Sequence, residues 1–477
     1  MPVVLPTDCA VWLLVAAAVA FALHVRRHEH LAAPWQRVAR SASGMSALTV
    51  LAAFVLVGLL DSLHFRPQLE GRDRTGEAVY AVEVRSVLDQ LVLPLKTRSE
   101  RTYSAPLATH AYSKETAELP GGGMARDYPR LRYGGAHLAD PHERDRDVAL
   151  TVARGLLLAA AIMALGTWIG AAVVGRRHGA STAAAWRAIR RGETAFPWRA
   201  ILLTKAALLA VALPAALLAA NYHVLGTDKV GQDVLYLALK SIRTGLVIGT
   251  VTTLVMLPFA VLLGITAGYF KGWIDDLIQY LYTTINSIPA VLLIAAAVLM
   301  MQVYVDKHPE LFPTTAQRAD FRLLMLCAIL GVTTWTGLAR LLRGEALKLR
   351  ELEYIQAAHA FGVRHARVIT RHILPNVMHI VLITLVMDFS GLVLAEAVLS
   401  YVGVGVDPSM ISFGTMINAA RLEMAREPMV WWSLAAAFAF MFVLVLAANL
   451  FADAVRDAFD PRVRVGAAPA LRAGGAG

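Results

Sequence analysis

The chain has 477 residues, of which 57% are hydrophobic and only 17% are charged, and its mean hydropathy is +0.55. This composition is too apolar for a soluble protein and indicates a membrane protein with several spans. The net charge of +10 is typical of basic loops that orient spans and contact anionic lipid, so we exclude nucleic acid as a partner. The two cysteines, Cys9 and Cys327, lie in apolar segments and exclude a disulfide framework or a cysteine metal site.

Apolar runs long enough to cross a bilayer recur along the chain. The nine runs are 9–25, 44–63, 149–175, 201–220, 245–270, 277–303, 321–341, 376–400 and 431–452. The first run resembles the apolar part of a signal peptide, but it lacks a basic region before it and a clear cleavage site, so we count it as a span. Pro289 is expected to kink the sixth run. The sequence predicts an all-α polytopic membrane protein with about nine transmembrane helices.

Arginine clusters predict which ends of the spans face the cytoplasm. One cluster, within residues 26–40, lies between the first two runs, and another, within 176–199, lies between the third and fourth. Short loops rich in Arg and Lys stay on the cytoplasmic side. Counting runs from these loops places the segment 342–375 and the C-terminus in the cytoplasm. The segment 64–147 is then external, because long segments cross the membrane largely regardless of charge.

The chain divides near residue 222. Residues 1–222 form an N-terminal extension with about four spans and the external insert 64–147, and the sequence leaves open whether this insert folds. Residues 223–464 hold five spans with short connections, and 465–477 are expected to be a disordered tail. The added N-terminal block leaves room for a sensory or assembly module fused to the rest.

A polar sequence opens the second half of the chain. Gly226, Thr227, Asp228, Gly231 and Asp233 follow one another within eight residues. Thr227 or Asp228 is expected to cap an amphipathic helix that runs to residue 243 and lies in the external interface. The segment does not fit a phosphate-binding loop, because Gln-Asp stands where such a loop needs Lys-Ser or Lys-Thr. Any ATP must therefore be hydrolysed by a partner.

Residues 342–375 form a polar island between two apolar runs. Leu349, Leu352, Ile355 and Ala358 recur at helical spacing, which predicts a short helix with one apolar face. Gly362 is expected to end this helix in a left-handed turn. A second short piece follows, and Pro375 is expected to stop it. The island is where a membrane protein would meet a cytoplasmic partner.

Asp388 and Glu396 lie in the eighth run. An acidic group in hydrocarbon is costly and normally faces a bundle interior or water, so both are candidates for a translocation path. The alternative is a structural role, in which each group pairs across helices. Asp388 also leaves open an ion-coupled secondary transporter. An enzyme would need converging titratable residues, and these two share one helix.

Three motifs carry a resemblance to a known family. Gln356-Ala357-Ala358, Gly362 and Leu374-Pro375 resemble the Glu-Ala-Ala loop of binding-protein-dependent ABC importer permeases. The sequence from Gly226 to Asp233 is similar to the external signature of the oligopeptide, dipeptide and nickel permeases. Gln356 stands where Glu is usual, and His372 stands where Ile is usual, the latter being typical of the peptide branch. The resemblance covers about residues 223–464.

The resemblance implies a type I importer permease core of the second, C-type kind, which is not an enzyme and binds no cofactor. It implies that the loop 342–375 couples the chain to an ATPase. The residues assigned to this coupling are Glu351, Tyr354, Gln356, Ala357, Ala358, Gly362, Leu374 and Pro375.

The resemblance also implies partners and a location. The partners are a homologous second permease, two ABC ATPase subunits that use ATP, an external solute-binding protein and membrane lipid. The location is the bacterial inner membrane. Di- or oligopeptides are the expected solutes, with nickel chelates and peptide-like antibiotics as alternatives.

Overall fold

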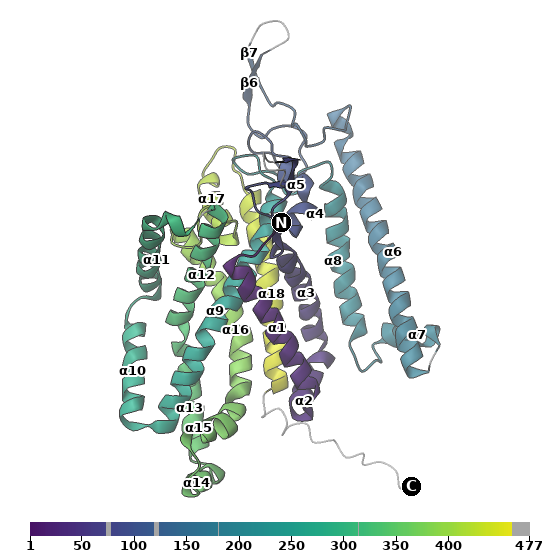
Figure 1. The fold of residues 1–477 in the computed structure, drawn as a ribbon. Helices are drawn as coiled ribbons and strands as arrows, with labels where there is room; N and C mark the ends of the chain where they lie inside the picture. The colour runs from purple at the N-terminus through teal and green to yellow at the C-terminus, as the bar shows by residue number, and fades with distance from the viewer. Residues whose placement is uncertain (73–77, 119–123, 180, 313, 460–477) are drawn as a thin grey trace.

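The computed structural model describes residues 1–72, 78–118, 124–179, 181–312 and 314–459 (Figure 1). In this part of the chain, nine helices are long and apolar enough to cross a membrane. These candidate spans are Pro6–Arg26, Ala42–Asp61, Pro141–Arg176, Trp198–Leu218, Val234–Phe270, Ala290–Lys307, Thr315–Arg350, His365–Val402 and Trp432–Phe459. Each predicted run overlaps one of them, which confirms the all-α polytopic fold. The predicted tail 465–477 lies outside the described residues.

The N-terminal extension contributes two groups of helices. The first group is α1 (Pro6–Arg26), α2 (Glu29–Arg40) and α3 (Ala42–Asp61), and the second is α6 (Arg144–His178), α7 (Thr182–Arg191) and α8 (Trp198–Leu218). Helices α6 and α8 pack together as a hairpin, and α8 also packs on α3. Figure 1 shows this hairpin on one side of the bundle, with α7 at its lower end.

The described part of the insert is folded. It carries short helices α4 (Val87–Leu91) and α5 (Leu93–Thr97) and a 3₁₀ turn at Pro141–Glu143. Its strands are β2 (His64–Phe65), β3 (Gln68–Arg72), β4 (Ala78–Tyr80), β5 (Arg85–Ser86), β6 (Glu115–Glu118) and β7 (Met124–Asp127). Antiparallel pairing joins β3 to β4, β6 to β7, and β2 to both β5 and the N-terminal strand β1 (Pro2–Val3).

Helix α9 (Val234–Phe270) is the centre of the second half. It packs against α12 (Thr315–Thr334), α13 (Thr336–Arg350) and α16 (Leu374–Val402). The close contact with α13 depends on glycine, because a Cβ on Gly264 would lie 2.6 Å from the carbonyl oxygen of Ala339. Small residues allow membrane helices to approach in this way. Helices α17 (Phe413–Glu423) and α18 (Trp432–Phe459) complete the bundle.

The predicted span 277–303 is two helices rather than one kinked helix. Helix α10 (Gly272–Ser287) ends before Ile288, which is extended, and α11 (Ala290–Lys307) begins after Pro289. A proline disfavours helical conformation in the residue before it, which explains the break. Figure 1 shows the two helices stacked along one edge of the molecule.

Candidate functional site

The polar island forms the end of the bundle opposite the insert. Helix α13 ends at Arg350, α14 (Glu353–Ala360) follows, and α15 (His365–Val368) continues through a π-helical turn (Ile369–Ile373) into α16. Figure 1 shows α14 protruding beyond the other helices at this end. The expected stop at Pro375 is wrong, because a proline in the first turn of α16 needs no backbone donor and the helix continues.

Helix α14 has one buried anchor and an exposed face. The side chain of Ile355 is 0% exposed, whereas Tyr354 is 45% exposed and Phe361 is 87% exposed. Tyr354, Ala357 and Phe361 are spaced by three and four residues, so they lie on one side of the helical segment. Phe361 is the most exposed large hydrophobic side chain among the described residues.

Gly362 makes the left-handed turn that the sequence predicts. Its φ is +72°, and the N–H of Val363 donates to the carbonyl oxygen of Ala358 at 3.0 Å. A Cβ at Gly362 would meet nothing within 4 Å. The need for glycine here comes from the backbone conformation and not from lack of space.

Two contacts tie the connection between α13 and α14 to the end of α9. Nζ of Lys271 lies 2.6 Å from Oε1 of Glu351, and Nη1 of Arg350 donates to the carbonyl oxygen of Tyr269 at 2.7 Å. The hydrogen bond and charge of Lys271 lower the pKa of Glu351. Gln356 donates from Nε2 to the carbonyl oxygen of Glu351 at 3.1 Å. The side chains of Glu351 and Gln356 thus hold the loop in place through contacts within this chain.

A cluster beneath α14 involves residues that the sequence reasoning missed. The hydroxyl of Tyr269 lies 3.1 Å from Nε2 of His359 and 2.8 Å from Nδ1 of His365. These contacts fasten both sides of the Gly362 turn to α9. The two histidines are 90 and 96 residues from Tyr269, so no local pattern in the sequence indicates the cluster.

The remaining predicted coupling residues lie at different depths. Ala357 is exposed, Ala358 is half-buried, and Pro375 is exposed at the start of α16. Leu374 is half-buried and packs against the apolar core beneath the loop. The exposed residues of the predicted set are Glu351, Tyr354, Gln356, Ala357, Gly362 and Pro375.

The two acidic residues of α16 lie in different surroundings. Glu396 is 1% exposed, and its Oε1 accepts hydrogen bonds from Ser400 at 2.6 Å and from Ser412 at 2.9 Å. It therefore joins α16 to the start of α17. Asp388 is half-buried and forms no hydrogen bond or ion pair with the described residues.

The external signature is a junction with the insert. Thr227 accepts a hydrogen bond at Oγ1 from the N–H of Ser104 at 2.7 Å, and Gly231 accepts one from the N–H of Glu100 at 2.9 Å. Gly226 and Gly231 both have positive φ, at +72° and +76°. A Cβ on either residue would overlap a carbonyl oxygen of the insert. The glycines therefore permit both the turns and the close approach.

The expected helix cap at Thr227 or Asp228 is wrong. Oδ1 of Asp233 accepts the N–H groups of Leu235 and Tyr236, so α9 begins at Val234. Asp228 instead closes its own turn, since Oδ1 accepts the N–H of Gln232 at 2.8 Å. The predicted interfacial helix is also wrong, because residues 234–243 are mostly buried in the protein and continue into the span.

His223 carries a charge in this junction. Its Nδ1 donates to Oδ2 of Asp233 at 2.8 Å, and its Nε2 lies 3.4 Å from Oε1 of Glu100, an ion pair without an aligned hydrogen bond. Burial alone would lower the pKa of His223, but the bonds and charges of Asp233 and Glu100 raise it to about 9. Burial likewise opposes ionisation of Glu100, but His223 and three backbone N–H groups lower its pKa to about 2.

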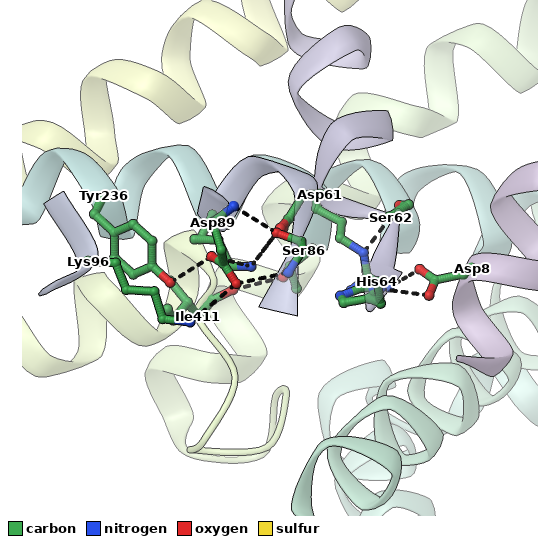
Figure 2. Close-up of polar contacts among 12 residues, drawn as sticks. Asp8, Asp61, Ser62, His64, Ser86, Asp89, Lys96, Tyr236 and Ile411 are labelled. Carbon is green, nitrogen blue, oxygen red and sulfur yellow. Dashed lines mark hydrogen bonds and ion pairs between the residues drawn. The ribbon is translucent and has the colours of Figure 1, made fainter. Parts of the chain in front are cut away.

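A second polar network fastens the extension to α9 (Figure 2). Nη2 of Arg243 lies 2.6 Å from Oδ1 of Asp8 in α1 and 3.5 Å from Oδ1 of Asp320 in α12. Nζ of Lys240 lies 2.5 Å from Oδ1 of Asp61 and 3.2 Å from Oδ1 of Asp89. All four carboxylates are nearly inaccessible to solvent. One turn of α9 therefore holds α1, α3, α4 and α12 together.

Comparison with known proteins identifies the family of the chain. Residues 260–465 match the family described as binding-protein-dependent transport system inner membrane component. The chain is 31% identical over 242 residues to the oligopeptide transport system permease protein OppC of Mycobacterium tuberculosis, which is 51% of this chain and 77% of the relative. It is 32% identical over 244 residues to the glutathione transport system permease protein GsiD of Pectobacterium atrosepticum, 51% of this chain and 73% of the relative.

A third relative is the dipeptide transport system permease protein DppC of Bacillus subtilis, with 28% identity over 242 residues, 51% of this chain and 69% of the relative. Permeases of this family are transport components without a bound cofactor, and partner ATPases supply ATP hydrolysis. Such importers also contain a binding protein and paired permeases. The chain belongs to the family of inner-membrane permeases of binding-protein-dependent ABC importers, in the peptide and nickel branch.

Proposed function

We propose that this chain forms one half of the translocation path of an ATP-driven importer for di- or oligopeptides. Relatives named for oligopeptide, dipeptide and glutathione transport support this solute class. The observation that carries the proposal is α14, a short helix tied to α9 that presents Tyr354 and Phe361 at the end of the bundle opposite the insert. Residues 223–464 are the proposed permease core.

The proposed orientation puts α14 and the C-terminus in the cytoplasm of a bacterium and the insert outside. The arginine-rich connections 26–40 and 176–199 favour this orientation. A homologous second permease would pair with this chain in the membrane. Two ATPase subunits would bind at the cytoplasmic end, one of them on α14, and the solute-binding protein would approach the insert.

The contacts of α14 suggest how force would pass to the spans. Closure of the ATPases would move α14, and Ile355 would carry that motion into the apolar core beneath it. The contacts of Arg350 and His359 with Tyr269 would carry it into α9. Because α9 packs on several other spans, its movement would switch the path between its two sides.

The ion-coupled secondary transporter that Asp388 left open in the sequence is not supported, because the chain belongs to the ABC importer permeases. Transport by such a transporter would collapse with uncouplers and would not need an ATPase. Importers of the same class for nickel or peptide-like antibiotics are further alternatives for the solute. Transport assays with an uncoupler and with ATPase depletion separate the two mechanisms.

A pull-down from native membranes tests the proposed function. The tagged chain is expected to bring down a second permease and P-loop ATPases, and Gly362→Arg is expected to lose the ATPases by distorting the turn after α14. The matched control is Gly192→Arg, since Gly192 also has positive φ, at +74°, and open space around it, but lies in the extension. ATPases that remain bound to Gly362→Arg would overturn the coupling assignment.

A further inference from the structure

The connection between α6 and α8 carries a strong positive charge. Between residues 176 and 199 the sequence has six arginines and one acid, Glu193. Among the described residues, Glu193 is the one carboxylate that pairs with any of these arginines, at 4.0 Å from Arg191, and both side chains are largely exposed. Such an ion pair is weak. The exposed arginines of the segment are Arg176, Arg187, Arg190, Arg191 and Arg199.

Helix α7 presents three of these arginines on one side. Its residues Ala185 and Ile189 are buried, and α7 packs on α6 and α8. Arg187, Arg190 and Arg191 are spaced by three and four residues, so they lie together on the opposite side of the helix. The face of α7 that is opposite its packed face is therefore exposed and basic.

Both ends of α7 are capped, so this basic face is held in one shape. Oγ of Ser181 accepts the N–H of Ala184 at 3.3 Å, and the N–H of Gly192 donates to the carbonyl oxygen of Ile189 at 3.1 Å. Trp186 lies at the border of the basic face and is 40% exposed. Exposed tryptophan is typical of the membrane interface. Helix α7 thus combines the residue types of an interfacial surface.

An exposed apolar stripe on α6 leads to the basic face of α7. Its five side chains are spaced by three and four residues and are 43% to 59% exposed. They are Leu158, Ile162, Leu165, Ile169 and Val173. Arg176 continues the stripe at the end of the candidate span Pro141–Arg176, and Figure 1 shows α7 beside this end of α6. Apolar side chains exposed on a span face lipid acyl chains, and an arginine at its end reaches the headgroups.

We propose that the end of α6 and the basic face of α7 bind an anionic phospholipid by its phosphate headgroup. Guanidinium groups bind phosphate through paired, charge-assisted hydrogen bonds. The choice of a lipid over a soluble anion rests on the apolar stripe, along which the acyl chains lie. The choice of an anionic lipid rests on the excess of arginine. The site belongs to the N-terminal extension and does not depend on the proposed function.

Native mass spectrometry of the complete chain in neutral detergent tests this proposal. The probes are phosphatidylglycerol, phosphatidylcholine and inorganic phosphate. Phosphatidylglycerol is expected to bind at least about fivefold more tightly than phosphatidylcholine, which is the factor expected for one arginine near an anionic headgroup. The triple variant R187Q/R190Q/R191Q is expected to weaken phosphatidylglycerol binding by at least about the same factor.

The matched control is R126Q/R132Q/R146Q, which removes three exposed arginines at the other end of the bundle and is expected to leave phosphatidylglycerol binding unchanged. An unchanged melting temperature shows that each variant is folded. Equal binding of the two lipids by the wild type, or equal losses in the two triple variants, overturns the site. Inorganic phosphate that displaces phosphatidylglycerol at equal concentration, or an acidic protein bound in its place, overturns the lipid as the occupant.

Discussion

At the scale of single residues, Ile355 is expected to stabilise the α14 segment and Phe361 is expected to serve coupling. Phe361 is 87% exposed and Ile355 is 0% exposed, although both belong to the same short helical segment. A side chain in water contributes little to folding, whereas a buried isoleucine contributes through its packing. A substitution of Ile355 should therefore lower the melting temperature, whereas a substitution of Phe361 should weaken coupling and leave the melting temperature unchanged.

Phe361→Ala is expected to leave the melting temperature unchanged and to reduce transport and ATPase co-purification strongly. Ile355→Ala is expected to destabilise the chain by about 2–4 kcal/mol, because it removes buried apolar atoms and leaves a cavity. Thermal melting and transport assays of both variants check this. The control is Leu422→Ala, which changes a 71% exposed side chain on α17. Full transport by Phe361→Ala would contradict the role given to the exposed face.

The raised pKa of His223 predicts that the stability of the folded protein depends on pH. Folding raises its pKa from 6.5 to about 9, so its ion pairs stabilise the folded protein fully below pH 6.5 and cease to do so as pH rises through 9. Folding lowers the pKa of Glu100 from 4.5 to about 2, so its contribution is present above pH 4.5 and is lost only as pH falls toward 2.

The stability difference between the wild type and His223→Asn should therefore be largest between pH 4.5 and 6.5 and should shrink toward pH 9. Melting temperatures across this range measure the difference. A matched control is His110→Asn, because His110 is an exposed histidine of the insert. A difference that stays constant with pH would show that His223 acts by packing alone.

At the scale of elements, the network around Arg243 makes the extension part of the permease. Asp8 and Asp320 come from two different helices, α1 and α12, and both pair with the buried Arg243. Removing one partner of a buried ion pair leaves an uncompensated charge, which is costly. The extension is thus not expected to behave as a detachable module, and deletion of residues 1–200 should abolish folding of the rest.

Asp8→Asn is expected to destabilise the chain by about 3–5 kcal/mol, because Arg243 loses its nearest carboxylate in a buried site. Asp145→Asn is the control, since it removes an exposed ion pair with Arg144 that is worth about 0–1 kcal/mol. Melting temperatures in nanodiscs compare the two. Equal melting temperatures of Asp8→Asn and the wild type would contradict a stabilising role for the polar network in Figure 2.

The elements that the sequence predicted well are those with local signals. Hydropathy alone located eight of the nine candidate spans and overlapped the sixth, and the position of Gly362 predicted its left-handed turn. The start of α9 was misplaced because Thr227, Asp228 and Asp233 are all good capping residues, and only the packing of the insert selects among them. The contacts of Tyr269 and Arg243 were not predictable, since their partners lie 77 to 235 residues away in the sequence.

At the scale of the whole molecule, the two ends of the bundle carry different structures. One end carries the folded insert, and the other carries α14 with the exposed side chains of Tyr354 and Phe361. Helix α9 connects them, beginning at the signature loop and ending at the contacts beneath α14. A permease in which solute arrives at one end and force at the other requires such a connection.

Site-specific photo-crosslinking from position 361 in native membranes tests whether α14 contacts an ATPase. Benzoylphenylalanine in place of Phe361 is expected to form adducts with a P-loop ATPase, identified by mass spectrometry. The same probe in place of Leu422, which is 71% exposed on α17, is expected to form none. An ATPase adduct at position 361 alone would establish α14 as the coupling helix. Two results would contradict a coupling role for α14. The first is ATPase present in the membranes but no adduct at position 361, and the second is equal adducts at both positions.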